Sequence, residues 1–379
     1  MTAAPQQAAA PGRMRLAAHF PVDDRAVRSD PRSGSEIAFS SFEHLARTAE
    51  RGLFDFLLLD DALPPREPGG PADDPDAAGC LEPLTVLAAL AAVTDRIGLA
   101  ATVSTTFNEP YEVARRFATL DHLSAGRAAW NVAASADARA AENFRRGGRL
   151  DRDGEHGRTA EFVATARELW DSWTPGGDPR PFAHHGRHFS VEGEFTVPRS
   201  PQGHPVVIRT GDRAQDRECA AYDADVVLTR HGTPEAGRAF RAVVGGRLAA
   251  YGREPGALTV MPRAGVVLGD TDAEARERAA ALRREPARAK GTFRQRVTEE
   301  TGCQPFVGTP ESVAAEMAHR VATGAADGFV IVPPPTPGGL DDFVDRVVPL
   351  LQERGMFRTA YTGSTLRSHL GLAEPVWKG

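Results

Sequence analysis

Short apolar runs alternate with amphipathic segments along most of the chain. The apolar runs begin near residues 15, 54, 97, 127, 204, 225, 258 and 328. They are continuous, which is typical of strands buried on both faces of a parallel sheet. Each run is followed by a segment with helical spacing of apolar residues, such as the helices predicted over residues 39–52 and 340–353. Another predicted helix has Thr309 as its N-cap and Pro310 at its first position. Strands that alternate with helices in this way indicate a parallel sheet of βα units.

The clearest unit of this pattern spans residues 108–135. It opens on a turn, continues as an amphipathic helix, breaks at Ser-Ala-Gly over residues 124–126 and becomes a short apolar strand. That strand ends near the polar residues Asn131 and Ser135. Eight such units fit a closed (β/α)8 barrel, or TIM barrel, better than an open doubly wound sheet. The open sheet stays an alternative on the pattern alone.

Two segments interrupt the alternation. Residues 174–203 are rich in Pro and Gly, and the run over 187–197 predicts a β-hairpin insertion. Residues 286–305 are polar and weakly patterned, and we interpret them as a shortened lid. We therefore expect a disordered tail over residues 1–13, a single barrel domain over 14–356 and an irregular C-terminal tail over 357–379 packed on the barrel.

Composition limits the class of function. The net charge is −6, so there is no basic surplus to meet a nucleic-acid backbone. No apolar run reaches the roughly 18 residues of a membrane span, and the first 13 residues lack the apolar core of a signal peptide. The cysteines Cys80, Cys219 and Cys303 are far apart and form no metal-binding spacing. We expect a cytoplasmic protein that binds neither nucleic acid nor membrane and holds no metal.

The polar residues at the strand ends are the candidate chemistry. In a barrel the carboxyl ends of the strands face one mouth, where active sites lie. The residues expected there are His19, Asp60, Asp61, Thr105, Thr106, Asn131, Ser135, Gly211, Asp212, Arg213, Arg230 and His231, with Arg152 and His156 from a loop. The sequence has no Gly-x-Ser-x-Gly elbow, P-loop or Gly-x-Gly-x-x-Gly motif. A polar mouth without its own reactive group indicates that a cofactor carries the chemistry.

The turn over residues 210–213 is a candidate phosphate site. It follows a predicted strand and opens a predicted helix, where a glycine permits close approach and helix amides point at an anion. The carboxylate of Asp212 repels phosphate, and Arg213 could offset it. The motif alone is a weak signal.

Several segments resemble the flavin-dependent monooxygenases of the nitrilotriacetate, dibenzothiophene-sulfone and pristinamycin synthase group, which belongs to the bacterial luciferase-like superfamily. One of them is Leu-Asp-His-Leu-Ser-Ala-Gly-Arg at 120–127. The resemblance covers most of residues 37–373, through the segments 82–99, 104–111, 120–132, 197–205, 306–311, 324–329, 337–344 and 366–372.

The resemblance implies a (β/α)8 barrel that binds reduced FMN delivered by a separate reductase. The flavin would react with O2 to form a peroxyflavin that oxygenates a small organic substrate at a C–N, C–S or related bond. It also implies a homodimer or higher homo-oligomer. Carried over by position, Asp61 and Thr106 would lie against the flavin ring with Asn131 nearby. The phosphate would lie over Gly211, Asp212 and Arg213 and over Arg152 and His156, while His19 and His231 are the candidate catalytic residues.

Several departures from the group fall on this site. The group usually has Ala-Asp where this chain has Asp60-Asp61, a His and a Tyr at the positions of Arg152 and His156, and Gly-Ser-Ser at 211–213. The first loop is reduced to the run over 23–32, and the lid before residue 307 is mostly missing. Two interpretations follow. Either arginines have rebuilt the anion site in a divergent monooxygenase, or flavin binding is altered, which would leave a deazaflavin oxidoreductase or a non-catalytic binding protein.

Overall fold

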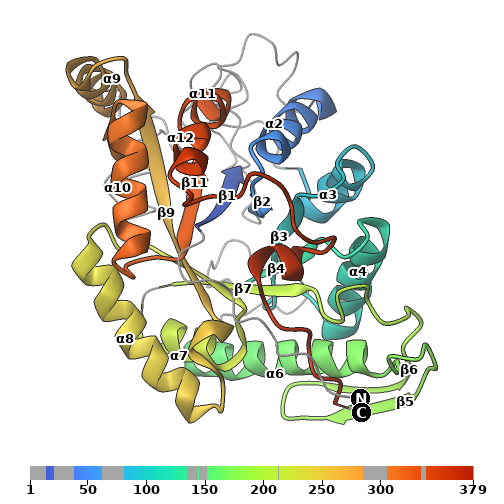
Figure 1. Cartoon of the computed structure of the whole chain (residues 1–379). Helices are drawn as coiled ribbons and strands as arrows, with labels where there is room; N and C mark the ends of the chain where they lie inside the picture. Colours follow the sequence, from blue (N-terminus) through green and yellow to red (C-terminus); the bar gives the residue numbers. More distant parts are fainter. Residues whose placement is uncertain are drawn as a thin grey trace, which may run out of the picture.

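A computed structural model describes residues 14–20, 38–61, 81–134, 144, 152–211, 213–284, 305–333 and 339–378. Within these residues eight parallel strands close a barrel (Figure 1). The strands are β1 (Arg15–Phe20), β2 (Phe56–Leu59), β3 (Gly98–Ser104), β4 (Ala128–Ala133), β7 (Val206–Thr210), β8 (Val226–Thr229), β9 (Thr259–Leu268) and β11 (Gly328–Val332). The predicted (β/α)8 barrel is confirmed.

Strand β9 closes the barrel. Its first residues pair with β8, from Val226↔Thr259 to Thr229↔Pro262, and its middle pairs with β11, from Val330↔Arg263 to Val332↔Gly265. Strand β1 pairs with β11 on one side and β2 on the other. Because every barrel strand has two parallel neighbours, the open-sheet alternative is excluded. The last residues of β9 extend beyond the barrel and pair with β10 (Phe306–Gly308), a strand too short to be predicted.

Helices surround the strands, and most begin where the sequence signals a start. Thr309 accepts a hydrogen bond from the backbone N–H of Ser312 at 3.3 Å and Pro310 follows it, as predicted. The helices are α2 (Phe39–Arg51), α3 (Pro83–Ala91), α4 (Pro110–Leu123), α6 (Arg152–Asp171), α7 (Ala214–Asp223), α8 (Pro234–Ala250), α9 (Asp272–Arg284), α10 (Pro310–Ala322), α11 (Gly339–Arg346), α12 (Val348–Glu353) and α13 (Leu366–Leu370).

Three local predictions were wrong. The single helix expected over 340–353 is divided into α11 and α12, because Pro349 has no N–H to donate and its ring obstructs a continuous helix. Helix α6 begins at Arg152, inside the segment expected to be a loop, and the buried Arg158 in its second turn donates to the carbonyl oxygens of Thr105 and Asn108. The C-terminal tail, expected to be irregular, contains α13.

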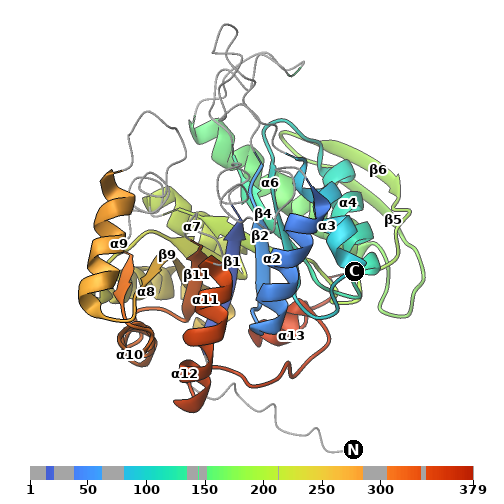
Figure 2. The same ribbon diagram turned by 90° about the horizontal axis from the view of Figure 1, so that it is seen from above.

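The predicted hairpin is present but starts earlier. Strands β5 (Pro181–His185) and β6 (Ser190–Glu194) pair antiparallel, so the first strand precedes the predicted range. The Glu161 carboxylate on α6 accepts hydrogen bonds from the backbone N–H groups of His188 and Phe189 at 2.9 Å each. The hairpin therefore lies at the edge of the molecule beside α6 and α4 (Figures 1 and 2).

Two apolar layers hold the barrel. One lies between strands and helices, and the other fills the barrel interior with side chains such as Phe56, Leu58, Ile208 and Met261. Leu366 and Leu370 of α13 complete the interior layer at the amino-terminal ends of the strands, and Figure 2 shows α13 on the same side of the barrel as α12. With one end closed by α13, the open mouth is at the carboxyl ends. Within the described residues, every helix is too short or too polar to cross a lipid bilayer.

Candidate functional site

Six polar side chains form a layer inside the barrel at its carboxyl end. Each comes two residues after an apolar interior residue, and side chains two apart on a strand share a face. They are His19 on β1, Asp60 directly after β2, Thr102 on β3, Asn131 on β4, Thr210 on β7 and Arg263 on β9. We call these six residues the polar belt.

Hydrogen bonds connect most of the polar belt. His19 Nε2 lies 2.6 Å from Asp60 Oδ2, and the Thr102 hydroxyl donates to Asp60 Oδ1 at 2.7 Å. Asn131 Nδ2 donates to Thr102 Oγ1 at 2.9 Å, and the Thr210 hydroxyl donates to Asn131 Oδ1 at 3.2 Å. The five side chains thus cross the mouth from β1 to β7 in one continuous chain.

Arg263 adds a positive charge to this chain. Its Nη2 is 4.0 Å from Asp60 Oδ2, and its side chain is 10% exposed. Two buried nitrogens of the belt, Arg263 Nε and His19 Nδ1, have no hydrogen-bond partner among the described residues. A buried polar atom left unpaired costs about 1–3 kcal/mol, so these two nitrogens indicate a polar ligand.

The pKa values of the two adjacent carboxyl groups, Asp60 and Asp61, are shifted in opposite directions. Burial acts to raise the pKa of Asp60, but the charges of His19 and Arg263 and the hydrogen bonds from His19 and Thr102 outweigh it and hold that pKa well below its usual range. Burial raises the pKa of Asp61 to about 6, helped by the charges of Glu82 and Asp60. Asp60 is therefore ionised at neutral pH, while Asp61 changes charge near pH 6.

The loop after β3 is tied to the start of α6. Thr105 Oγ1 lies 2.8 Å from Thr159 Oγ1, and the Arg158 guanidinium donates to the Thr105 carbonyl oxygen. The predicted flavin contact Thr106 is buried in this loop, and its N–H donates to Ser104 Oγ at 3.2 Å. These contacts place the β3 end and α6 side by side at the mouth.

The predicted phosphate site combines the first turns of α6 and α7. His156 Nδ1 on α6 lies 4.0 Å from Cys219 Sγ on α7. Gly211 has a φ of 147°, a backbone conformation that favours glycine, and Arg213 is exposed at the N-cap of α7. The Arg152 side chain, Asp212 and Ser135 lie outside the described residues.

Asp216 is a residue of this turn that sequence reasoning missed. Its Oδ2 accepts a hydrogen bond from the Arg213 backbone N–H at 3.1 Å, and its side chain fills the space that a Cβ on Gly211 would enter. The first turn of α7 therefore already contains a carboxylate. Its spacing, three residues after the N-cap, is the signal that could have revealed it.

His231 contacts a threonine of β8 and a phenylalanine of α8. Its Nε2 is 3.1 Å from Thr229 Oγ1, and its ring centroid is 5.3 Å from that of Phe240 on α8. Burial lowers its pKa to about 4, helped by the charges of Arg241, Arg320 and Arg217. These contacts are on the helix side of β8, and the catalytic role of His231 stays a prediction.

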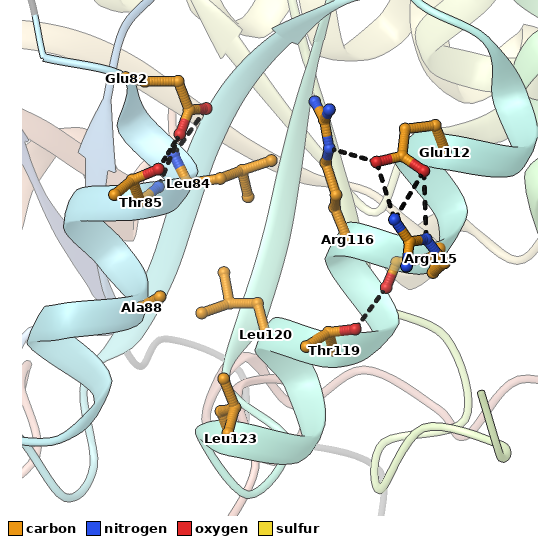
Figure 3. Close-up of a pocket in the computed structure, with 10 residues that line it drawn as sticks. All are labelled: Glu82, Leu84, Thr85, Ala88, Glu112, Arg115, Arg116, Thr119, Leu120 and Leu123. Atoms are coloured by element: carbon orange, nitrogen blue, oxygen red, sulfur yellow. Dashed lines mark hydrogen bonds and ion pairs between the residues drawn. The ribbon is translucent and has the colours of Figure 1, made fainter.

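A groove on the outer surface is separate from the mouth. It lies between α3 and α4, has a volume of about 620 Å³, and its polar groups largely pair with one another (Figure 3). Glu112, for example, accepts hydrogen bonds from Arg115 and Arg116 at 3.0–3.1 Å. The lining residues are Glu82, Leu84, Thr85, Ala88, Glu112, Arg115, Arg116, Thr119, Leu120 and Leu123. The belt, with its unpaired buried nitrogens, is the better candidate site.

Two residues of the polar belt, Thr102 and Arg263, were not among the predicted site residues. Both lie within apolar strands, Thr102 on β3 and Arg263 on β9. The signal was available, because a buried arginine in the run Thr-Val-Met-Pro-Arg-Ala-Gly over 259–265 needs a polar environment.

Comparison with known proteins places this barrel in a family. The chain is 37% identical to nitrilotriacetate monooxygenase component A of Aminobacter aminovorans, over 92% of each chain. It is 34% identical to dibenzothiophene-sulfone monooxygenase of Rhodococcus erythropolis, over 93% of this chain and 94% of that one. The structure of EDTA monooxygenase from Chelativorans sp. BNC1 matches with a TM-score of 0.82 and 28% identity, over 96% of this chain and 99% of the other.

The match to the family as a whole extends through the barrel. The sequence profile of the luciferase-like monooxygenases matches residues 25–327, which include most of the strands and four members of the polar belt between Asp60 and Thr210 as well as Arg263. The chain belongs to the luciferase-like monooxygenase family.

Proposed function

We propose that this chain is the oxygenase of a two-component system, a cytoplasmic homo-oligomer that uses reduced FMN from a separate reductase, together with O2, to oxygenate a small organic molecule. The observation that carries the proposal is the polar belt at the mouth of a luciferase-like barrel. Its six side chains can donate, accept and hold protons, but none can supply electrons to O2. A bound redox cofactor is therefore required for oxidation.

The mouth suits the ring of a flavin. The polar edge of that ring carries both hydrogen-bond donors and acceptors, and the unpaired His19 Nδ1 and Arg263 Nε need partners. Asp61, Thr106 and Asn131 are the residues that would hold the ring. Asn131 is fixed on both sides by Thr102 and Thr210, so its amide keeps one orientation.

The proposed site for the FMN phosphate contains both positively and negatively charged residues. Arg213 and His156 favour an anion, and Arg152, Gly211 and Asp212 complete the proposed phosphate site. The Asp216 carboxylate in the first turn of α7 disfavours it. We therefore expect the first turn of α7 to bind the FMN phosphate less tightly than the same turn would without a carboxylate.

The bound reduced flavin would supply the two electrons that activate O2. The chain would orient the ring with the polar belt and line the interior behind it with apolar side chains that exclude water. Two of the relatives are named for substrates with C–N or C–S bonds, nitrilotriacetate and dibenzothiophene sulfone. A small molecule containing such a bond is the proposed substrate class.

Anaerobic titration of the purified protein with reduced FMN tests the proposal. We expect micromolar affinity, followed by absorbance or fluorescence, and a loss of affinity of roughly tenfold in Arg213→Glu, since a charge at an anion site contributes about 1 kcal/mol or more. Arg238→Glu, an exposed site on α8, is the matched control. Absence of binding at high protein concentration would refute FMN use.

One observation, the Asp216 carboxylate, favours a second function, which is binding of a cofactor or ligand other than FMN. If that carboxylate excludes the FMN phosphate, the barrel would bind a deazaflavin cofactor or a ligand without catalysis. The same titration with a deazaflavin separates these outcomes, because preferential binding of the deazaflavin would replace the FMN proposal.

A further inference from the structure

We propose that His19 and Asp60 form a proton-transfer pair in the barrel mouth, in which Asp60 holds the imidazole so that Nδ1 exchanges a proton with the bound ligand. The pair rests on the proposed function and specifies the acid–base chemistry of the same site. The two partners come from neighbouring strands, because His19 lies on β1 and Asp60 directly follows β2.

The hydrogen bonds of the polar belt run in one direction. An ionised carboxylate only accepts hydrogen bonds, so the single O–H of Thr102 is donated to Asp60 Oδ1. The Thr102 oxygen must then accept from Asn131 Nδ2, which leaves Asn131 Oδ1 to accept from Thr210. Each hydrogen bond in the series from Thr210 through Asn131 and Thr102 is thus donated in the direction of Asp60.

This direction determines the tautomer of His19. Asp60 Oδ2 is an acceptor 2.6 Å from His19 Nε2, so Nε2 carries the hydrogen. In the neutral ring Nδ1 is then the nitrogen with the lone pair. A carboxylate that orients an imidazole and stabilises its protonated form is a recurrent arrangement in proton-transfer sites.

The free nitrogen of this ring is buried. The His19 side chain is 5% exposed, and Nδ1 has no hydrogen-bond partner among the described residues. A buried lone pair without a partner is unfavourable, and a ligand bound in the mouth would remove that cost. The orphan nitrogen is therefore the position where the ligand exchanges its proton.

The charges around the pair keep Asp60 in its accepting form. Arg263 on β9 lies 4.0 Å from the carboxylate oxygen that His19 also contacts. Asp61 follows Asp60, and Glu82 at the start of α3 acts on Asp61. The positive charge of Arg263 helps to keep Asp60 ionised, so that this carboxylate only accepts hydrogen bonds.

The proton step balances within a monooxygenation. When bound, reduced FMN would supply two electrons and two protons, so that one atom of O2 would enter the substrate and the other would leave as water. Nδ1 forms a bond to a proton from an O–H or N–H group of the ligand, whose bonding electron pair stays on the ligand. The imidazolium then returns that proton to the oxygen atom that leaves as water, which restores the neutral ring.

Nitrogen NMR of histidine-labelled protein without ligand tests the pair directly. At a pH where the ring is neutral, we expect the His19 signal, assigned by its loss in His19→Gln, to show an unprotonated Nδ1. In Asp60→Asn the amide would donate to Nε2 and move the hydrogen to Nδ1. A wild-type ring protonated on Nδ1, or a tautomer unchanged in Asp60→Asn, would overturn the proposal.

The kinetic test uses His19→Gln, because its amide N–H can still donate to Asp60 while the base is removed. Wild type and variant are loaded with reduced FMN and mixed with O2, so that FMN and hydrogen peroxide form, and flavin absorbance is followed from pH 6 to 9. With reduced FMN saturating for each protein, we expect the variant to reoxidise the bound flavin about 10²-fold more slowly, with the pH dependence lost.

A rate within about threefold of wild type would contradict the pair, since general acid–base catalysis contributes roughly 10²-fold or more. The two proposals fail separately. If neither protein binds FMN, the proposed function fails, while the NMR measurement still decides whether the His19–Asp60 pair exists.

Discussion

At the scale of single residues, Asp121 shows how the corner between α4 and β4 is built. Its side chain is fully buried, and Oδ1 accepts hydrogen bonds from the Ala128 N–H at 2.9 Å and from Gln202 Nε2 at 2.6 Å. Oδ2 and the nearby Ser200 Oγ are both buried, and neither has a hydrogen-bond partner in the part of the chain that the structure describes. Burial raises the pKa of Asp121 to about 6, although these hydrogen bonds act to lower it.

Asp121→Asn is expected to stabilise the protein at pH 8. Because the pKa of Asp121 is higher in the folded state than its ordinary 3.8, its contribution to stability is complete below that value and is lost as pH rises through about 6. An amide keeps the Oδ1 acceptor without the buried charge, and we expect a gain on the order of 1–3 kcal/mol.

Urea unfolding of wild type and variant between pH 4 and 8 measures this gain. The difference should shrink toward zero near pH 4, where the wild-type carboxyl is protonated. Asp178→Asn, at an exposed position, is the control and should change little at any pH. A variant less stable than wild type at pH 8 would contradict the assignment of a costly buried charge.

At the scale of elements, the first turn of α7 decides how the cofactor phosphate is held. Asp216→Asn keeps an acceptor for the Arg213 N–H but removes the charge. Since a charge near a helix N-terminus contributes about 0.3–1 kcal/mol, we expect FMN affinity to rise up to about fivefold. Riboflavin, which lacks the phosphate, should bind equally to both proteins.

Parallel titrations with FMN and riboflavin distinguish this effect from a general change in the mouth. An equal gain for both flavins would mean that Asp216 acts on the ring and not on the phosphate. High salt should reduce the difference between wild type and variant, because exposed charges are screened.

Helix α13 is the second element with a clear energetic role. Leu366 is fully buried inside the barrel, and a Cβ on Gly98 would lie 2.6 Å from its Cδ1, so the helix packs directly on the start of β3. Arg367 lies 3.1 Å from Asp225 Oδ2, and Arg15 donates to the Leu370 carbonyl oxygen at 2.9 Å.

Leu366→Ala is expected to lower the free energy of unfolding by about 2–5 kcal/mol, the usual cost of a cavity in a packed core. Val376→Ala, at a side chain that is 78% exposed, should change it by less than about 0.5 kcal/mol. Denaturant unfolding measures both. Equal stabilities would mean that α13 does not close the barrel in solution.

At the scale of the whole molecule, the C-terminal tail joins distant parts of the chain. Trp377 Nε1 donates to the Asp171 carbonyl oxygen at 2.8 Å, and the Arg180 guanidinium lies 5.3 Å from the Trp377 ring centroid. The Asp171 carboxylate also contacts Arg199 at 2.6 Å and His204 at 2.8 Å. The tail thus connects α6 and the hairpin segment to the rest of the barrel.

We expect the barrel, the hairpin and the tail to unfold together. The fluorescence difference between wild type and Trp377→Phe reports on the tail, and far-UV circular dichroism reports on the strands and helices. Their urea midpoints should coincide, as in a single cooperative unit. A tail signal lost at lower urea, with the dichroism unchanged, would show that residues 357–379 are independent of the barrel domain.

Local patterns predicted most of the barrel because each strand is buried on both faces and each helix on one. The first residues of β1 and β11, at positions 15 and 328, are where the apolar runs begin. The local patterns did not predict elements whose formation depends on contacts with distant residues. Helix α13 is a five-residue segment that exists because the barrel interior accepts Leu366 and Leu370, and β10 exists because β9 extends beyond its other partners.

The sequence by itself determined the βα alternation, the hairpin and the polar strand ends that contain His19 and Asn131, because burial periodicity and turn residues are local properties. Only the tertiary structure decided which polar groups meet. His19 and Asp60 are 41 residues apart, and Arg263 is far from both. Closure of the barrel brings His19 and Arg263 next to the Asp60 carboxylate. Closure depends on contacts between distant strands, so it cannot be inferred from the spacing of residues within one segment. The tertiary structure likewise revealed Asp216 against Gly211, where the identity of one side chain controls the charge of the proposed phosphate site.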